Sequence, residues 1–200
     1  MFYTIENKVF SELKIQRSLF IAALYPVESP EQARSILAEH TRQYADATHN
    51  CYAYACGINQ EITYYADAGE PGGTAGKPIL NALLRNNLSN VLAVVTRYYG
   101  GIKLGVKGLI EAYGAAVEQA VGNARLVAAR LWHVFHVECD YPSFDSLKHR
   151  CSDLDHILSE VSYAQKVSFD LSVTDEQKQQ LIDILDGYTL FSGLIYSHKT

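Results

Sequence analysis

Apolar and polar residues alternate over residues 3–10 and 14–25, a pattern that predicts two β-strands at the start of the chain. Ser29 has the chemistry of a helix N-cap, and Pro30 suits the first helical position. Apolar residues then recur at helical spacing up to about Tyr44. The opening of the chain is therefore predicted to fold as two strands followed by a helix.

Two segments rich in tyrosine and small apolar residues come next, at 50–57 and 61–66, and Asn59 between them favours a hairpin. A helical pattern follows over 74–87. The run 91–96 is continuously apolar, which is typical of a buried strand.

The longest helical pattern of the chain covers residues 103–124. Its apolar positions predict that Leu109, Ile110 and Tyr113 face inward. This helix closes the first part of the chain.

After this helix, the predicted elements follow the order β-α-β-β-α-β, which is the ferredoxin-like order. Thr174 is the expected N-cap of the second helix. The expected strands cover 131–141, 157–164, 166–174 and 190–197, and the expected helices cover 142–154 and 175–185. The chain is thus predicted to be α+β with two domains, residues 1–128 and 129–200, joined within 125–130.

Composition narrows the class of protein. The 200 residues are 48% hydrophobic and 20% charged, as in soluble globular proteins. The longest apolar run, 19–25, is far short of the roughly 20 residues that cross a membrane, and the N-terminus lacks an apolar signal segment. We expect a cytoplasmic protein with no membrane partner and reduced cysteines. The four cysteines lack metal-ligand spacing, so neither a cofactor nor an obligatory metal is expected.

Charge is distributed unevenly around a net value of −5. Residues 129–200 hold 6 basic and 11 acidic residues, whereas residues 71–125 hold six basic and two acidic ones. The second stretch predicts a local basic face on a protein that is not a general polyanion binder.

The sequence GEPGGTAGKP, residues 69–78, places glycines just where a helix is expected to begin. Free N–H groups at a helix start attract anions, glycine allows close approach of a ligand, and Lys77 adds a positive charge. The segment is not a Walker A loop, because Pro71 and Pro78 stand where that motif needs Gly and Ser or Thr. An anion site and a tight packing turn are both open readings.

A second glycine cluster follows the buried strand. Arg97 at the strand end can pair with a carboxylate such as Glu70, or with a phosphate. Tyr98 and Tyr99 are either stacking platforms or core residues. Two lysines in the following helix, Lys103 and Lys107, share one face, which is either a binding face or simply solvated.

Acid-base and nucleophilic candidates are sparse. His49 and Cys51 alternate onto one face of a strand, but a nucleophile also needs a base and an orienting group within reach. Asp67 and Glu70 flank the glycine loop as an acid/base pair, as a loop cap or as partners of nearby cations. No complete catalytic constellation is visible, so we expect a binding protein and keep an enzyme as the alternative.

Four segments resemble hallmark segments of the Impact/YigZ family: LKIQRSLFIAALYPV, ADATHNCYAYACG, YADAGEPGGTAGKPIL and VVTRYYGGIKLGVKGLIEAYGAAV. The resemblance implies an N-terminal β-α sandwich similar to the second domain of a small-subunit ribosomal protein. It also implies a C-terminal ferredoxin-like domain similar to the last domain of elongation factor G. Since both relatives act on RNA or the ribosome, the resemblance implies a translation-linked role.

The first hypothesis is a translation-linked regulatory protein that binds RNA, the ribosome or a translation-associated protein. The alternative is a small-molecule protein or enzyme that binds a phosphate-containing ligand in the GEPGGTAGK loop. The candidate binding residues are Glu70, Gly72, Gly73, Thr74, Gly76, Lys77, Arg97, Tyr98, Gly100, Gly101, Lys103 and Lys107.

Overall fold

A five-stranded antiparallel sheet forms the centre of the N-terminal unit in the computed structural model, which describes residues 2–199. Its order is β2-β3-β6-β4-β5, so β2 and β5 are the edges and β6 lies in the middle. The prediction of a buried strand over 91–96 is confirmed. The strands are β2 (Val9–Ile15), β3 (Ser18–Pro26), β4 (His49–Cys56), β5 (Ile62–Ala66) and β6 (Val91–Tyr98).

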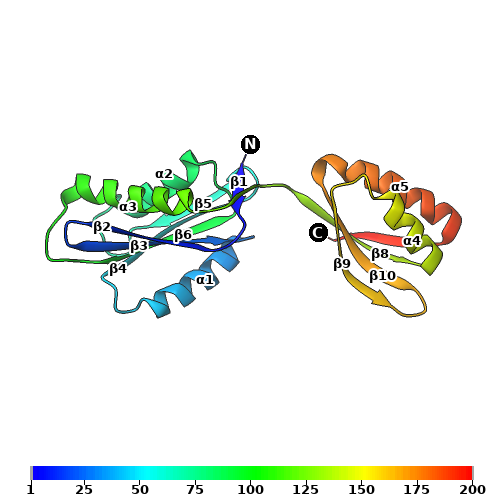
Figure 1. Ribbon diagram of the computed structural model, residues 1–200, viewed down its shortest axis with the longest axis horizontal. Helices are drawn as coiled ribbons and strands as arrows, with labels where there is room; N and C mark the ends of the chain where they lie inside the picture. The colour runs from blue at the N-terminus through cyan, green and yellow to red at the C-terminus, as the bar shows by residue number, and fades with distance from the viewer. Residues whose placement is uncertain (1, 200) are drawn as a thin grey trace. The chain divides into compact units, whose positions relative to one another are not determined.

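Helices cover both faces of this sheet (Figure 1). α1 (Pro30–Gln43) packs on one face, and α2 (Gly76–Arg85) and α3 (Gly105–Gly122) pack on the other. The larger core lies under α2 and α3, where Phe20 and Tyr113 meet edge to face with ring centroids 5.2 Å apart. The sheet thereby holds the start of β4 beside the end of β6, and α3 packs against the same face.

The predicted start of α1 is confirmed, since the Ser29 hydroxyl accepts the N–H of Gln32 at 3.3 Å and Pro30 opens the helix. The predicted inward position of Ile110 is wrong. Its side chain is 42% exposed, whereas Leu109 and Tyr113 are buried. The buried face of α3 includes Leu109, Tyr113 and Val117, and Ile110 lies outside that face.

The strand predicted over 3–10 is two strands. β1 (Tyr3–Ile5) leaves the sheet and pairs antiparallel with β7 (Leu126–Ala128), a strand that falls within the expected domain boundary. Three-residue strands have too few positions to show a period in the sequence. β7 pairs with β1, and Tyr3 of β1 also forms a parallel bridge with Leu88.

The chain divides after Ala129 into a second compact unit. Its element order is β-α-β-β-α-β, as predicted, and its antiparallel sheet has the order β11-β8-β10-β9. The elements are β8 (Trp132–Cys139), α4 (Tyr141–Arg150), β9 (His156–Tyr163), β10 (Val167–Thr174), a short 3-10 helix η1 (Asp175–Gln177), α5 (Lys178–Ser192) and β11 (Ile195–Lys199).

Two details of this unit differ from the expectation. Thr174 makes no side-chain cap bond, because the chain first forms a 3-10 turn there. The strand expected from residue 190 begins only at Ile195, because α5 continues to Ser192 and ends at Gly193 in the left-handed conformation (φ 65°).

Candidate functional site

A buried ion pair lies where β6 reaches the glycine-rich loop. Arg97 Nη1 donates to Glu70 Oε1 at 2.5 Å, and the two side chains are only 6% and 4% exposed. The guanidinium lies over two rings, with its carbon 5.4 Å from the centroid of Phe20 and 5.3 Å from that of Tyr99. Of the two partners predicted for Arg97, a carboxylate or a phosphate, the folded structure therefore contains the carboxylate of Glu70.

The same carboxylate ties in groups from α3 and β4. The Tyr113 hydroxyl donates to Glu70 Oε1 at 2.9 Å, and the Cys51 thiol lies 3.3 Å from that hydroxyl. Burial raises the pKa of Cys51 to about 12, so the thiol stays protonated at neutral pH. His49 Nδ1 donates to the carbonyl of Ala68 at 2.9 Å, and Nε2 stands 4.0 Å from Glu70. These contacts stabilise the fold and do not assemble a nucleophile.

The N–H groups of the glycine-rich loop are bound by a side chain of the protein itself. Asp67 accepts the backbone N–H of Gly73 at 2.8 Å, of Ala75 at 3.0 Å and of Gly76 at 2.8 Å. Burial alone raises the pKa of Asp67, but these three hydrogen bonds together hold it below its ordinary value. Asp67 is the loop cap, and an external anion at this place would have to displace its carboxylate.

Two glycines of the candidate set are required by close packing. A Cβ on Gly76 would stand 2.7 Å from backbone atoms of Ala66, and a Cβ on Gly100 would stand 1.8 Å from the carbonyl oxygen of Arg17. Gly72 has open space around it. At Gly76 and Gly100, glycine is therefore required because a neighbouring backbone segment packs too closely for a side chain. The second contact also brings the β2–β3 turn against the loop that follows β6.

A groove of about 350 Å³ opens above the ion pair. Its lining residues come from the glycine-rich loop, the end of β6 and the start of α3: Glu70, Pro71, Arg97, Tyr99, Lys103, Leu104, Gly105, Val106 and Leu109. Glu70 is the single acidic residue among them, and it is neutralised by Arg97. No side chain caps the start of α3, and its first turn has no acidic residue. The groove therefore offers Lys103 and the α3 N–H groups to an incoming anion.

Most of the positive charges of the stretch 71–125 are paired with carboxylates in the folded structure. Arg85, Arg97, Lys107 and Arg125 each lie within 4.0 Å of a carboxylate. Two of the acidic partners, Glu70 and Glu6, lie outside the stretch. Across residues 2–199, Lys77 and Lys103 are the cations of this stretch with no ion pair. Tyr98 donates to Asp46 at 2.9 Å, so its hydroxyl also faces an acid.

Arg17 is a residue that the sequence reasoning missed. It is exposed at the β2–β3 turn, no ion pair is found for it within the described chain, and it lines a second hollow of about 340 Å³ with Lys14, Gln16, Ser18 and Leu19. Its place next to Gly100 follows only from the packing of two loops that are far apart in sequence. No local signal could have shown it.

The remaining candidates occupy the margins of this region. Thr74 is buried, and its hydroxyl donates to the carbonyl of Pro71 at 2.7 Å. Gly101 has a positive φ of 85° in the loop after β6, and Lys77 is exposed at the start of α2. The structure thus brings Glu70, Arg97 and Lys103 together at the groove, whereas Gly73 and Gly76 belong to the Asp67 cap.

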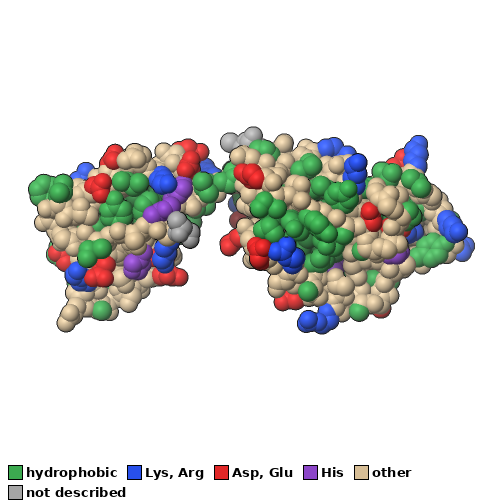
Figure 2. Space-filling model, turned by 180° about the vertical axis from the view of Figure 1, so that it is seen from behind, with side chains coloured by type: hydrophobic (Ala, Val, Ile, Leu, Met, Phe, Trp, Pro, Cys, Tyr) green, Lys and Arg blue, Asp and Glu red, His purple; other side chains and the backbone are tan. Residues whose placement is uncertain are grey.

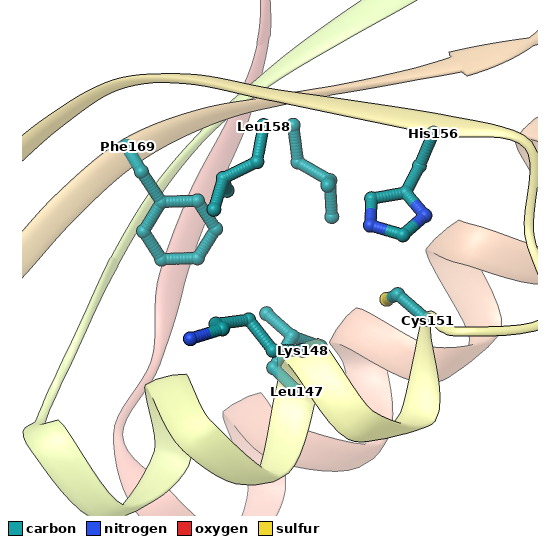
Figure 3. A pocket seen from close by; sticks show the side chains of 7 residues that line it. Leu147, Lys148, Cys151, His156, Leu158 and Phe169 are labelled. Atoms are coloured by element: carbon teal, nitrogen blue, oxygen red, sulfur yellow. The ribbon is translucent and has the colours of Figure 1, made fainter.

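The C-terminal unit has a cavity between α4 and strands β9 and β10, where Cys151 and His156 face the same space (Figure 3). Its volume is only about 10 Å³, which suffices for a water molecule but not for a larger ligand. Burial raises the pKa of Cys151 to about 11, and His156 Nδ1 donates to the carbonyl of Leu154. We therefore assign no ligand to this cavity.

Lys and Arg side chains are scattered among acidic and hydrophobic ones on the face drawn in Figure 2. That face offers no continuous basic surface. Over the described chain, no helix is long and apolar enough to cross a membrane. Residues 2–199 also contain no group of three or more His, Cys, Asp or Glu side chains able to hold a metal ion.

Two family models match the chain. The Impact N-terminal domain matches residues 16–121, and a domain of unknown function, DUF1949, matches residues 137–186. The IMPACT family member YvyE of Bacillus subtilis is 35% identical over 88% of this chain and 81% of its own. The IMPACT family member YigZ of Escherichia coli is 35% identical over 64% of each chain.

Solved structures are also similar. The crystal structure of a protein described as hypothetical covers 97% of this chain and 96% of its own, with 27% identity and a TM-score of 0.68. The two-domain translational regulator Yih1 covers 61% of this chain and 47% of its own, with 24% identity and a TM-score of 0.37. The second likeness is too low for the description of Yih1 to be carried over to this chain.

Proposed function

The chain belongs to the Impact family, and from this premise we propose that it is a translation-linked binding protein that contacts RNA or the ribosome with its N-terminal unit. The groove above Arg97 carries the proposal. It combines Lys103, which has no ion pair among the described residues, with an exposed Tyr99 and an uncapped helix start. Its single acidic lining residue, Glu70, is neutralised by Arg97.

Each feature suits a phosphate-rich partner. When a lysine neutralises a phosphate of a nucleic acid, the counterions condensed on that nucleic acid are released, and this release favours binding. Tyr99 is 43% exposed, and its ring offers a face on which a base can stack. Arg17 lies on the neighbouring turn and extends the positive charge beyond the groove.

The contact surface of this proposal is smaller than the sequence alone indicates. Arg97 is neutralised by Glu70, Lys107 lies 3.8 Å from Glu111, and Tyr98 is bonded to Asp46. With a net charge of −5, the protein is suited to one restricted site and not to coating a nucleic acid.

Co-sedimentation with ribosomes tests the proposal. Purified protein is added to a cell lysate at low and high salt, as wild type and as Lys103→Glu and Arg17→Glu. Lys8→Glu is the control, because Lys8 is exposed in the same unit at the far end of β2 from Arg17 and undergoes the same charge change.

We expect salt-sensitive co-sedimentation that is lost in Lys103→Glu, weakened in Arg17→Glu and retained in the control. A nuclease-treated lysate separates RNA from a translation-associated protein partner: binding that survives the nuclease assigns the contact to protein. Absence of binding at both salt concentrations contradicts the proposal.

A phosphate-containing small molecule in the GEPGGTAGK loop is not the favoured function. The N–H groups that would hold it are bonded to Asp67, and Cys51 and Glu70 are committed to structural contacts. A thermal-shift screen of nucleotides and sugar phosphates tests this alternative directly, since a ligand of the native state raises the melting temperature.

A further inference from the structure

The side chain of Arg97 has one hydrogen-bond donor without a partner. Its Nη1 binds Glu70, and its Nη2 lies 3.4 Å from the hydroxyl of Ser18. Its Nε is buried and has no acceptor, which is unique among the buried side-chain nitrogen and oxygen atoms of the described residues. A buried donor without an acceptor is energetically unfavourable, so this N–H is a place where an acceptor would stabilise the protein.

Arg97 also lines the groove, together with the residues of the α3 start. The start of α3 lacks both a capping side chain and an acidic residue, so the N–H groups of its first turn have no side-chain acceptor. Lys103 stands directly before this helix and has no ion pair within residues 2–199. Donors from three sources therefore border one hollow.

We propose that this groove is a binding subsite for a single phosphate group, held by Lys103, by Nε of Arg97 and by the first N–H groups of α3. The inference deepens the proposed function, on which it rests, by naming the chemical group that the site recognises. A phosphate oxygen accepts several hydrogen bonds at once, and its charge suits both a lysine and a helix start.

The charges at the groove support an anion over a cation. Glu70 contributes the single negative charge, and Arg97 and the Tyr113 hydroxyl both donate to it. With that pair neutral, Lys103 and the partial positive charge of the helix start remain. The acidic Glu111 lies one turn further along α3, 3.8 Å from Lys107, and does not line the groove.

Tyr99 is the exposed aromatic residue beside Arg97. The centroid of its ring is 5.3 Å from the guanidinium carbon and it lines the groove, whereas Phe20, at 5.4 Å from the same carbon, is fully buried. Because Nε is buried, a phosphate contacts it only after a local shift of side chains at the groove. Phosphate binding should change the environment of Tyr99 together with that of Arg97.

The test is a titration of the full chain with inorganic phosphate, followed by the NMR signals of the Arg97 Nε–H and of the Val106 and Lys107 amides. Sodium chloride at matched ionic strength is the reference. The variants are Lys103→Gln and, as the matched control, Lys8→Gln. A second series uses a nucleoside monophosphate and a short RNA without terminal phosphates, which separates a phosphomonoester from the RNA backbone.

We expect saturable shifts at all three sites, slower exchange of the Arg97 Nε–H, and about 10-fold weaker binding in Lys103→Gln with no change in the control. An unresponsive Nε–H, or equal effects of both variants, overturns the inference. If the groove takes phosphate and the monoester but neither the RNA nor ribosomes, the subsite stands and the proposed function fails. If ribosomes bind without any change at the groove, the subsite fails alone.

Discussion

Glu70 and Arg97 are 27 residues apart in the chain and form an ion pair that is almost fully removed from solvent. The pair joins the glycine-rich loop to the end of β6, directly beneath the groove. It fixes the loop that carries Pro71 against the strand that leads to Tyr99 and Lys103.

Breaking this pair is expected to destabilise the N-terminal unit. Glu70→Ala leaves the guanidinium buried without its counterion, which should cost about 3–5 kcal/mol. Unfolding in urea, followed by circular dichroism, measures the loss. Trp132 is the only tryptophan and lies in the C-terminal unit, so its fluorescence reports that unit separately.

The matched control for this substitution is Glu111→Ala. Glu111 pairs with Lys107 at 3.8 Å, with side chains 66% and 91% exposed, and such a pair contributes about 0–1 kcal/mol. Equal effects of the two substitutions would contradict the structural role assigned to Glu70.

Gly100→Ala should be severely destabilising, because the new Cβ would stand 1.8 Å from the carbonyl oxygen of Arg17. Either β6 or the β2–β3 turn must move, and the groove would be distorted. Gly72→Ala is the control, because nothing lies within 4 Å of its Cβ position. We expect Gly72→Ala to stay within about 0.5 kcal/mol of the wild type. Thermal unfolding of both variants checks the contrast, and a melting curve of Gly100→Ala equal to wild type would contradict the contact.

The stability of the N-terminal unit should fall on mild acidification because of His40. Its Nδ1 lies 2.8 Å from the Tyr25 hydroxyl and its Nε2 lies 2.7 Å from the Thr96 hydroxyl, and burial lowers its pKa from 6.5 to about 4. The unfolded chain then binds a proton that the folded chain does not bind. The contribution of neutral His40 to the free energy of unfolding is fully present above about pH 6.5 and is lost as the pH falls towards about 4.

His40→Gln keeps a hydrogen-bonding side chain at this place but removes the titration. Its free energy of unfolding should therefore vary less with pH than that of the wild type, with a difference on the order of 3 kcal/mol at most. Urea unfolding at several pH values between about 7 and 5 measures the slope. Parallel pH profiles for the two proteins would show that His40 titrates normally.

The cysteines should be inert in the native protein. All four are buried, and burial raises the pKa of Cys51 to about 12 and those of Cys139 and Cys151 to about 11. Iodoacetamide near neutral pH should modify them slowly until denaturant is added. Mass spectrometry of the alkylated protein checks this, and rapid native alkylation of Cys51 would reopen its candidacy as a nucleophile.

Much of the fold could be predicted from local patterns. α1 has a strong start signal at Ser29 and Pro30, and β6 begins with five consecutive apolar residues, 91–95. The elements that were missed or misplaced are either very short or determined by contacts between residues far apart in the sequence. β7 has three residues and pairs with the distant β1, while α5 continues past its predicted end at residue 185 and ends at Gly193.

The candidate site was predictable where partners are close in sequence. Asp67 could be expected to cap a loop only six to nine residues away, and Glu70 was a foreseeable partner of Arg97. The local charge excess was misleading, because Glu6 binds Arg125 from the other end of the domain. Arg17 stayed hidden because its neighbour Gly100 is 83 positions away, and only packing brings them together.

The pairing of β1 with β7 sets an order of events during synthesis. Tyr3 pairs with Ala128 and Ile5 pairs with Leu126, so β1 is synthesised long before its strand partner β7. The backbone bonds of Tyr3 to Asn87 and Ser89 can form earlier, because those residues precede β7 in the chain. The N-terminal unit therefore cannot be completed as a nascent chain before the polypeptide joining it to the second unit has been made. Until then β1 lacks its partner strand, and completion of this unit is tied to the timing of translation itself.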